Sequence, residues 1–218
     1  PLTDATTFAN QYGAALLLNS PHTGLLTADA ESKAVVGNFP DIFVMPHFTS
    51  VPWNAIGFTA AQEATVNAIN GSYAPYNGGL DQAFLGGLIT AEERDKRKIT
   101  FAVGANGPVI EDETLTDLSG LGLPSIREAI STDVFPLSTG SVLGTEATPG
   151  NPATVWGIGK ALTDQYVILP SEKTAINNAR TAYNTAIKNI ADANTTRIAF
   201  ADVSAHFQSL VTNQAAII

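Results

Sequence analysis

The residue types that carry out covalent hydrolysis are present in this sequence, but they form no familiar pattern. A serine hydrolase needs a nucleophilic Ser on a sharp turn, a His that accepts its proton and an acid that orients the His. No GxSxG segment occurs. The nearest alternative is Ser141, in the segment TGSVL at residues 139–143, which lies in a Gly-, Thr- and Pro-rich stretch with no helix expected after it. We therefore expect Ser141 to be an ordinary loop serine, and we assign no catalytic residue.

The chain has three histidines, and each has a functional and a structural interpretation. His206 follows Asp202 by four residues, a spacing that places both on one helix face and would let the acid orient the imidazole. The interpretation we favour is that Asp202 caps a helix beginning at Val203. His47 follows an expected strand, where loops often carry ligand sites, and the interpretation we favour for the residue taken alone is a packed loop histidine. We expect His22 to lie in a solvated turn.

Metal and nucleotide motifs are incomplete. Acidic side chains gather at residues 111–117, but their spacing does not fit an EF-hand loop, and we expect a solvated acidic rim there. These are Glu111, Asp112, Glu113 and Asp117. The segment GIGK at residues 157–160 lacks the rest of either nucleotide fingerprint. Cys is absent, which excludes thiol catalysis, disulfides and thiolate zinc sites. The sequence thus predicts no metal and no cofactor.

Composition indicates a folded, acidic protein. Of its 218 residues, 44% are hydrophobic and 14% are charged, enough apolar material for a sizeable core. Eleven basic and 20 acidic residues give a net charge of −9, and the densest basic stretch is short, at residues 94–98. Nucleic acid and anionic membrane surfaces are therefore not expected as partners. The apolar run at residues 14–18 is too short to span a bilayer, and we expect no transmembrane segment.

Regular helix and strand patterns occur at both ends of the chain. Apolar residues at helical spacing predict a helix over residues 3–18, and a β-branched run predicts a strand over residues 33–39. Near the C-terminus, a long apolar stripe predicts a helix over residues 171–194. A second strand over residues 197–202 and a helix over 203–210 follow. We expect both strands to be buried on both faces of one mostly parallel sheet, as in α/β proteins.

The middle of the chain is irregular and is predicted to be an insertion. Repeated Pro and Gly residues interrupt residues 42–150, and the periodicity there degrades. The sequence predicts a core from residues 1–41 and 151–218, with residues 42–150 inserted between its two parts. Within the insertion we expect helices at residues 59–70 and 80–89, a hairpin of 99–103 with 109–111, and a helical turn at 125–130.

Several segments, taken in order, resemble a known family. They are KAVVGNFPD at residues 33–41, PHFTSVPWN at 46–54, TDQYVIL at 163–169, AINN at 175–178 with Tyr183 and Asn184, and FADV at 200–203. Their order and approximate spacing resemble the GDSL (SGNH) lipases and acylhydrolases of the Bacteroidetes type along most of the chain. None of these segments is a catalytic block of that family.

The resemblance implies a three-layer α/β/α fold of flavodoxin-like appearance, here incomplete. It also implies a catalytic Ser near the N-terminus, Gly and Asn oxyanion donors, and an Asp-x-x-His pair near the C-terminus, blocks that this sequence lacks. The chain therefore resembles the central part of such an enzyme, and we interpret Pro1 and the apolar end at Ile218 as potential cut points. A secreted, periplasmic or outer-membrane-anchored lipoprotein is the location that the resemblance implies.

Two functional hypotheses follow. In the first, the chain is a fragment of a secreted carboxylic ester hydrolase, inactive by itself, whose parent acts through Ser, His and Asp on a small-molecule, lipid or glycan ester. In the second, it is a complete non-catalytic module that binds a ligand or partner through an aromatic-rich insertion. The aromatic residues concerned are Phe43, Phe48, Trp53, Phe58, Tyr73 and Tyr76.

A substrate site is predicted beyond the C-terminal end of the strand at residues 33–39, because open α/β sheets bind ligands at strand ends. Asn38, Asp41, His47 and Trp53 follow that end and combine polar groups with a large apolar surface. The alternative is that Asn38 and Asp41 satisfy turn backbone while Trp53 packs inward.

Overall fold

The computed structural model describes residues 2–18 and 23–214. The expectations about His22 and about the two chain ends concern residues outside these ranges. The chain divides into two compact units, which are described separately: a discontinuous unit of residues 1–44 and 171–218, and an inserted unit, Met45–Pro170. The boundary thus assigns residues 151–170 to the inserted unit, whereas the sequence placed the end of the insertion at residue 150. Helices mix with short strands, as expected for the α/β class.

The discontinuous unit contains the regular helices and strands that the sequence predicts at both ends of the chain. The two strands and three helices all appear within a few residues of their expected bounds. They are α1 (Ala5–Leu17), β1 (Ala34–Gly37), α5 (Pro170–Asp192), β6 (Ile198–Ala201) and α6 (Val203–Gln214). Asp4 begins α1 as its N-cap, since its carboxylate accepts a hydrogen bond of 2.9 Å from the Thr7 backbone N–H.

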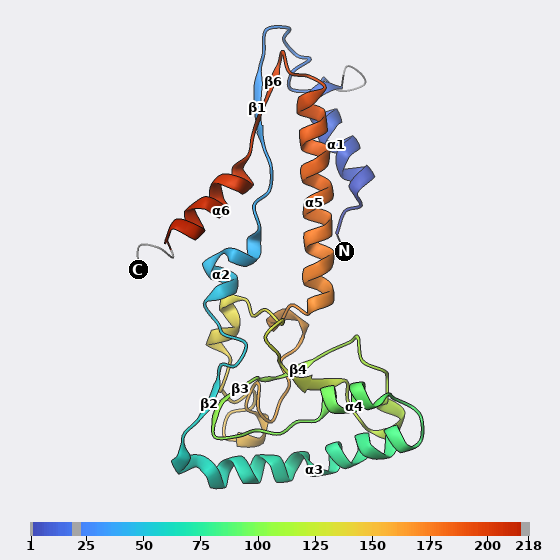
Figure 1. The fold of residues 1–218 in the computed structure, drawn as a ribbon, viewed down its shortest axis with the longest axis vertical. Coiled ribbons are helices and arrows are strands. Elements are labelled where there is room, and N and C mark those ends of the chain that lie inside the picture. The colour runs from blue at the N-terminus through green and yellow to red at the C-terminus, as the bar shows by residue number, and fades with distance from the viewer. Residues whose placement is uncertain (1, 19–22, 215–218) are drawn as a thin grey trace. The chain divides into compact units, whose positions relative to one another are not determined.

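β1 and β6 pair in parallel, so the prediction of one parallel sheet is confirmed for these strands. The register runs from Ala34 opposite Ile198 to Gly37 opposite Ala201. Figure 1 shows α1 and α5 side by side next to this pair. The apolar stripes of the two helices bury one face of the pair in a small core. Its buried members are Leu16, Leu26, Val36, Ile187, Ala191 and Ile198.

The opposite face of the β1–β6 pair is open, and the prediction that both strands are buried on both faces is wrong. Val35 is 74% exposed, whereas its neighbour Val36 is 5% exposed. Side chains alternate between the faces of a strand, and only one face of this pair has helices packed on it. The apolar composition of these strands therefore does not show that the face carrying Val35 is covered.

The inserted unit is built from short elements around three apolar clusters. One cluster is centred on Phe58 and Phe101, another on Phe135 and Leu162, and the third on Leu80. Its main elements are α2 (Pro46–Thr49), β2 (Ile56–Phe58), α3 (Glu63–Leu85), α4 (Ala91–Arg97), β3 (Gly104–Asn106), β4 (Val109–Glu111) and β5 (Ile126–Glu128).

Strand pairing in the inserted unit differs from the prediction. β3 pairs antiparallel with β2, and β4 pairs antiparallel with β5. The prediction of a hairpin between residues 99–103 and 109–111 is therefore wrong. Residues 126–128 form a strand rather than the predicted helical turn. Residues 104–106, which lie between the two strands of the expected hairpin, are themselves β3, and their partner strand lies about fifty residues earlier in the chain.

One long helix replaces the two helices expected at residues 59–70 and 80–89. α3 runs without interruption from Glu63 to Leu85 and contains Pro75 in its interior. An internal proline removes a backbone hydrogen bond and costs about 3 kcal/mol. Burial of Val66, Leu80 and Ala83 along the same helix offsets this cost. Tertiary packing thus overrides the local helix-breaking pattern.

Among the helices of residues 2–18 and 23–214, none is both long enough and apolar enough to cross a bilayer.

Candidate functional site

A polar crevice opens in the discontinuous unit where β1 and β6 end. Its volume is about 330 Å³, and two of its lining residues, Asn38 and Asp202, come directly after the two strands. Parallel strands bring their carboxyl ends to the same edge, which explains why residues 164 positions apart meet there. The complete lining is Asn38, Thr181, Asn184, Thr185, Lys188, Asn189, Phe200 and Asp202.

One face of α5 supplies most of this lining. Thr181, Asn184, Thr185, Lys188 and Asn189 recur at intervals of three and four residues, which places them on one side of a helix. The core residues of α5 recur at the same period on another side. The spacing of these five polar residues is visible in the sequence and is the signal that identifies this face of α5.

Asn38 and Asp202 hold the edge of the crevice together. The Asn38 amide donates a hydrogen bond of 2.8 Å from Nδ2 to Asp202 Oδ1, and Asn38 Oδ1 accepts one of 2.8 Å from the Ser204 backbone N–H. Asp202 Oδ1 also accepts from the Ala205 backbone N–H at 2.9 Å, so Asp202 caps α6 as we favoured. The bonds from Ala205 and Asn38 lower the pKa of Asp202, so its carboxylate is ionised at neutral pH.

Several polar groups of the crevice remain available to a ligand. Within the described part of the chain, no hydrogen bond reaches Asp202 Oδ2 or the amide of Asn189. Lys188 pairs with Asp192 at 2.7 and 2.9 Å, and its ammonium lies 5.6 Å from the centre of the Phe200 ring. A carboxylate oxygen, a free amide and an ammonium can bind a hydroxyl-rich molecule. The lining contains no Ser, His or Cys, and the hydroxyls of Thr181 and Thr185 donate to backbone carbonyls of α5.

The four predicted substrate-binding residues fall into different units. Asn38 lines the crevice, but Asp41 does not, because its Oδ1 accepts a 2.9 Å hydrogen bond from the Phe43 backbone N–H and turns the chain. His47 and Trp53 belong to the inserted unit. His47 lies on α2 with its ring edge-to-face against Phe48 at 4.7 Å, and Trp53 is 39% exposed. The combined four-residue site therefore stays a prediction.

The other candidate catalytic residues have structural surroundings. Ser141 Oγ donates a 2.7 Å hydrogen bond to the carbonyl of Ser138, as an ordinary loop serine does. His206 meets Asp202 only through the backbone, where its N–H donates to the Asp202 carbonyl at 3.2 Å. Among the described residues, no Ser, His and Asp side chains form a hydrogen-bonded set.

The expected acidic rim is wrong for Asp112. The Asp112 side chain is 1% exposed and pairs with Arg127 at 2.5 Å and with Lys96 at 3.1 Å. Burial favours its neutral form, but hydrogen bonds from Thr114, Arg127 and Lys96 outweigh burial and lower its pKa to about 2. Asp112 is thus a structural anion.

The aromatic residues of the insertion mostly pack within the protein. Phe58 is buried in a core cluster, and Tyr73 and Tyr76 pack against the same cluster. Their hydroxyls donate to backbone carbonyls of Ile158 and Ile126, at 2.5 and 2.8 Å. Desolvation raises the pKa of Tyr73 to about 12, with a smaller contribution from Glu128. Phe58, Tyr73 and Tyr76 therefore belong to the core of the inserted unit.

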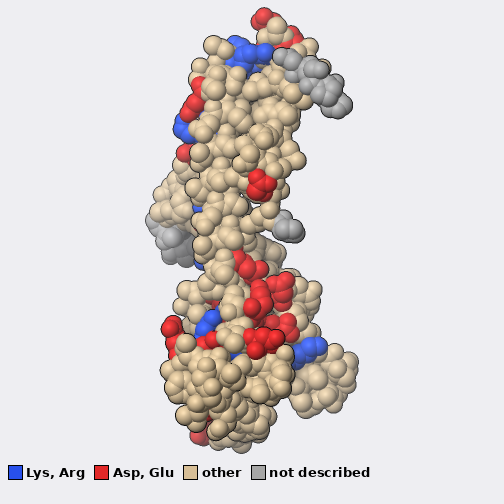
Figure 2. Space-filling model, turned by 90° about the vertical axis from the view of Figure 1, so that its right-hand side faces the viewer, with Lys and Arg blue, Asp and Glu red and all other residues tan. Residues whose placement is uncertain are grey.

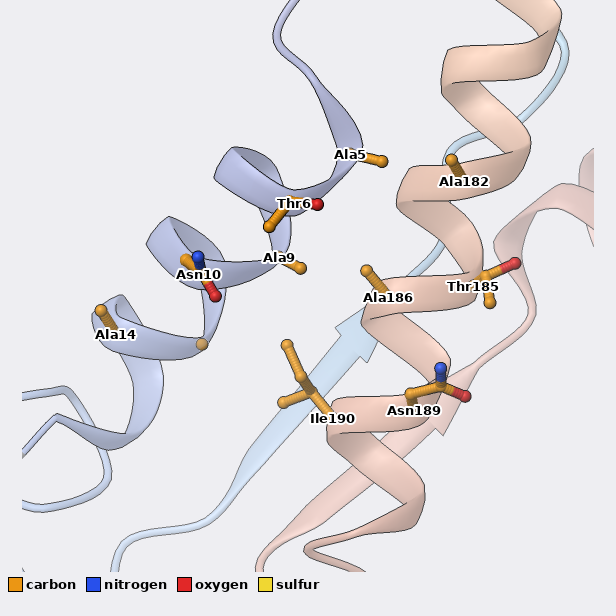
Figure 3. A pocket seen from close by; sticks show the side chains of 11 residues that line it. Ala5, Thr6, Ala9, Asn10, Ala14, Ala182, Thr185, Ala186, Asn189 and Ile190 are labelled. Atoms are coloured by element: carbon orange, nitrogen blue, oxygen red, sulfur yellow. The ribbon is translucent and has the colours of Figure 1, made fainter.

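A groove between α1 and α5 adjoins the polar crevice and shares Thr185 and Asn189 with it. It has a volume of about 530 Å³, and Figure 3 shows Ala9, Ala186 and Ile190 pointing into the space between the helices. The face of the discontinuous unit seen in Figure 2 carries few charged side chains. Small side chains line this groove without a charged group, so the polar crevice has the stronger chemistry.

Comparisons with models of known families, with curated proteins and with solved structures found no match to this chain.

Proposed function

We propose that this chain is part of a carboxylic ester hydrolase of the SGNH type, in which it supplies α/β scaffold and a substrate crevice. The observation that carries the proposal is the parallel pairing of β1 with β6, which the inserted unit separates in the sequence, together with a polar crevice at the carboxyl ends of these strands. Ligands of open α/β sheets bind at this end of the strands. The family resemblance involves both strands and the segment after each of them.

The complete fold in this proposal is a three-layer α/β/α sandwich. α1 and α5 form one helical layer, and the exposed face around Val35 is where the second layer packs. The catalytic Ser, the oxyanion donors and the Asp-x-x-His pair come from blocks that the 218 residues do not contain. The family also places the parent protein in a secreted, periplasmic or outer-membrane-anchored location.

The proposal predicts that the 218-residue chain has no esterase activity. The nucleophile, the oxyanion donors and the catalytic His of the family are missing from the 218 residues, and these groups are what accelerate ester hydrolysis. The chain is incubated with p-nitrophenyl acetate and butyrate, and separately with a fluorophosphonate probe, beside an active serine esterase as positive control. We expect turnover equal to the buffer blank and no covalent label.

Turnover above the blank, or labelling of Ser141, would contradict the proposal. Ser141→Ala is the matched variant for this outcome, because it removes the only hydroxyl we considered as a nucleophile and leaves the backbone turn in place. Activity that persists in Ser141→Ala would point to a nucleophile elsewhere in the chain.

A second candidate function, from a different class, is a ligand-binding module without catalysis. The polar crevice favours it, because the open groups of Asn189 and Asp202 can bind hydroxyl groups, and the lining contains no His to activate a hydroxyl for attack. This candidate relies on the crevice rather than on the aromatic insertion. Binding of a polyol to a chain whose complete gene encodes no GDS block would support it over the hydrolase.

A further inference from the structure

The open face of the β1–β6 pair carries only small or apolar residues. Val35 shares this face with Gly37, Ala199 and Ala201, because side chains alternate along each strand and the two strands pair in register. Val35 is 74% exposed, whereas α1 and α5 cover the opposite face of the pair. Parallel strands in α/β proteins are normally covered by helices on both faces. We call these four residues the open sheet face, and its chemistry suits a helix.

α6 carries an apolar stripe that the chain leaves exposed. Four apolar residues of α6 recur at intervals of four, three and one, which places them on one side of the helix. They are Val203, Phe207, Leu210 and Val211. Val203 is 43% exposed and Leu210 is 51% exposed, and every described side chain of this helix, over residues 203–213, is at least partly exposed. Residues 203–214 contain no Asp, Glu, Lys or Arg, so no such charge opposes burial of the α6 stripe.

A one-residue connection keeps α6 from folding back over the strand that precedes it. β6 ends at Ala201 and α6 begins at Val203, whereas connections between strands and helices in α/β units usually have about 2 to 6 residues. Asn38 donates to Asp202 Oδ1 and accepts from the Ser204 backbone N–H, both at 2.8 Å, and these bonds fix the first turn of α6. Figure 1 shows α6 leading away from the strand pair. The α6 stripe and the open sheet face of one copy are therefore held apart.

We propose that two copies of this chain form a dimer by exchanging α6, so that the α6 stripe of each copy covers the open sheet face of the other. The two contacts are then identical, as two-fold symmetry requires. Short hinge connections favour such an exchange, because the second copy presents the surface that the helix cannot reach in its own chain. The exchanged helices supply the second layer that the proposed fold places over Val35. The inference goes beyond the proposed function, because it requires neither a catalytic group nor an ester.

Sedimentation velocity of the whole chain tests the proposal over concentrations from about 1 to about 100 μM. We expect a dimer at the upper end that dissociates toward the lower end, because each contact joins one short helix to two short strands and affinity should be about micromolar. A chain that stays monomeric at about 100 μM would overturn the proposal. The esterase assay does not depend on the oligomeric state, so the two proposals can fail separately.

Two variants test the two surfaces, and a third is the matched control. Val35→Asp places a charge on the open sheet face, and Leu210→Asp places one on the α6 stripe. Each should weaken the dimer at least about a hundredfold, because each contact loses about tenfold or more and the symmetric dimer contains the substitution in both contacts. Leu85→Asp changes a side chain of the inserted unit that is also 74% exposed, and it should leave the dimer unchanged.

Far-ultraviolet circular dichroism shows whether each variant retains its fold, which the exposure of all three side chains predicts. A dimer that survives in folded Val35→Asp would overturn the exchange, because the open sheet face would then lie outside the contact. Survival of the dimer in folded Leu210→Asp would do the same for α6. A loss in Leu85→Asp as large as that in the other two variants would also overturn the proposal.

Discussion

Replacement of Arg127 by Met should destabilise the inserted unit more than any surface charge change. Arg127 lies on β5, and its side chain is 1% exposed. Its Nε donates to Asp112 Oδ2 at 2.5 Å, while Nη1 and Nη2 donate to the two carboxylate oxygens of Asp133 at 2.7 and 2.8 Å. The guanidinium therefore pairs with two buried carboxylates at once, and Lys96 supplies the second positive charge.

The magnitude follows from what the variant leaves behind. Asp112 keeps an ion pair with Lys96 at 3.1 Å, but the fully buried Asp133 side chain loses its charged partner. An uncompensated buried charge costs about 3 to 5 kcal/mol. With a urea m-value of about 2 kcal/mol per molar, the midpoint of unfolding should fall by about 2 M.

Tryptophan fluorescence during urea unfolding measures this loss selectively. The two Trp residues of the chain, Trp53 and Trp156, both lie in the inserted unit. Arg94→Met is the matched control, because Arg94 forms only partly exposed pairs with Asp81 and Asp95. Such pairs contribute less than about 1 kcal/mol. A loss in Arg127→Met no larger than that in Arg94→Met would refute the argument that this network stabilises the unit.

Two further predictions concern acid stability and the polar crevice. The pKa of Asp112 in the folded chain is about 2, below the ordinary 3.8, so its ionisation stabilises the fold above pH 4 and that stability is lost as the pH falls toward 2. Between pH 4 and pH 2, the free energy of unfolding measured with urea should therefore fall by about 2 kcal/mol more for the wild type than for Asp112→Asn. Parallel curves of unfolding free energy against pH for the two proteins would contradict the lowered pKa of Asp112. Asn189→Ala should weaken binding of a polyol such as an acetylated monosaccharide several-fold in an NMR titration, whereas Asn178→Ala, an exposed Asn of α5 outside the crevice, should not. Equal binding by both variants would remove Asn189 from the site.

The sequence by itself determined the helices and strands of the discontinuous unit. The helix predicted over residues 171–194 became α5, because its apolar stripe repeats over more than five turns and needs no distant partner to be recognised. Asp202 was correctly predicted to cap a helix, because capping depends on residues three positions away. Local periodicity and local hydrogen bonding carry this information.

Only the tertiary structure decided which segments meet. The pairing of β3 with β2 rather than with its sequence neighbour, and the passage of α3 through Pro75, depend on burial against residues far along the chain. The same holds for the polar crevice, where the stripe on α5 faces Asn38 and Asp202. The alternation of side chains along a strand shows which residues share a face. It does not show which segment covers that face, or whether any segment does, as the exposed Val35 illustrates. Packing between segments that are distant in the sequence decides which faces are covered, and a local sequence pattern does not reveal the free energy of that packing.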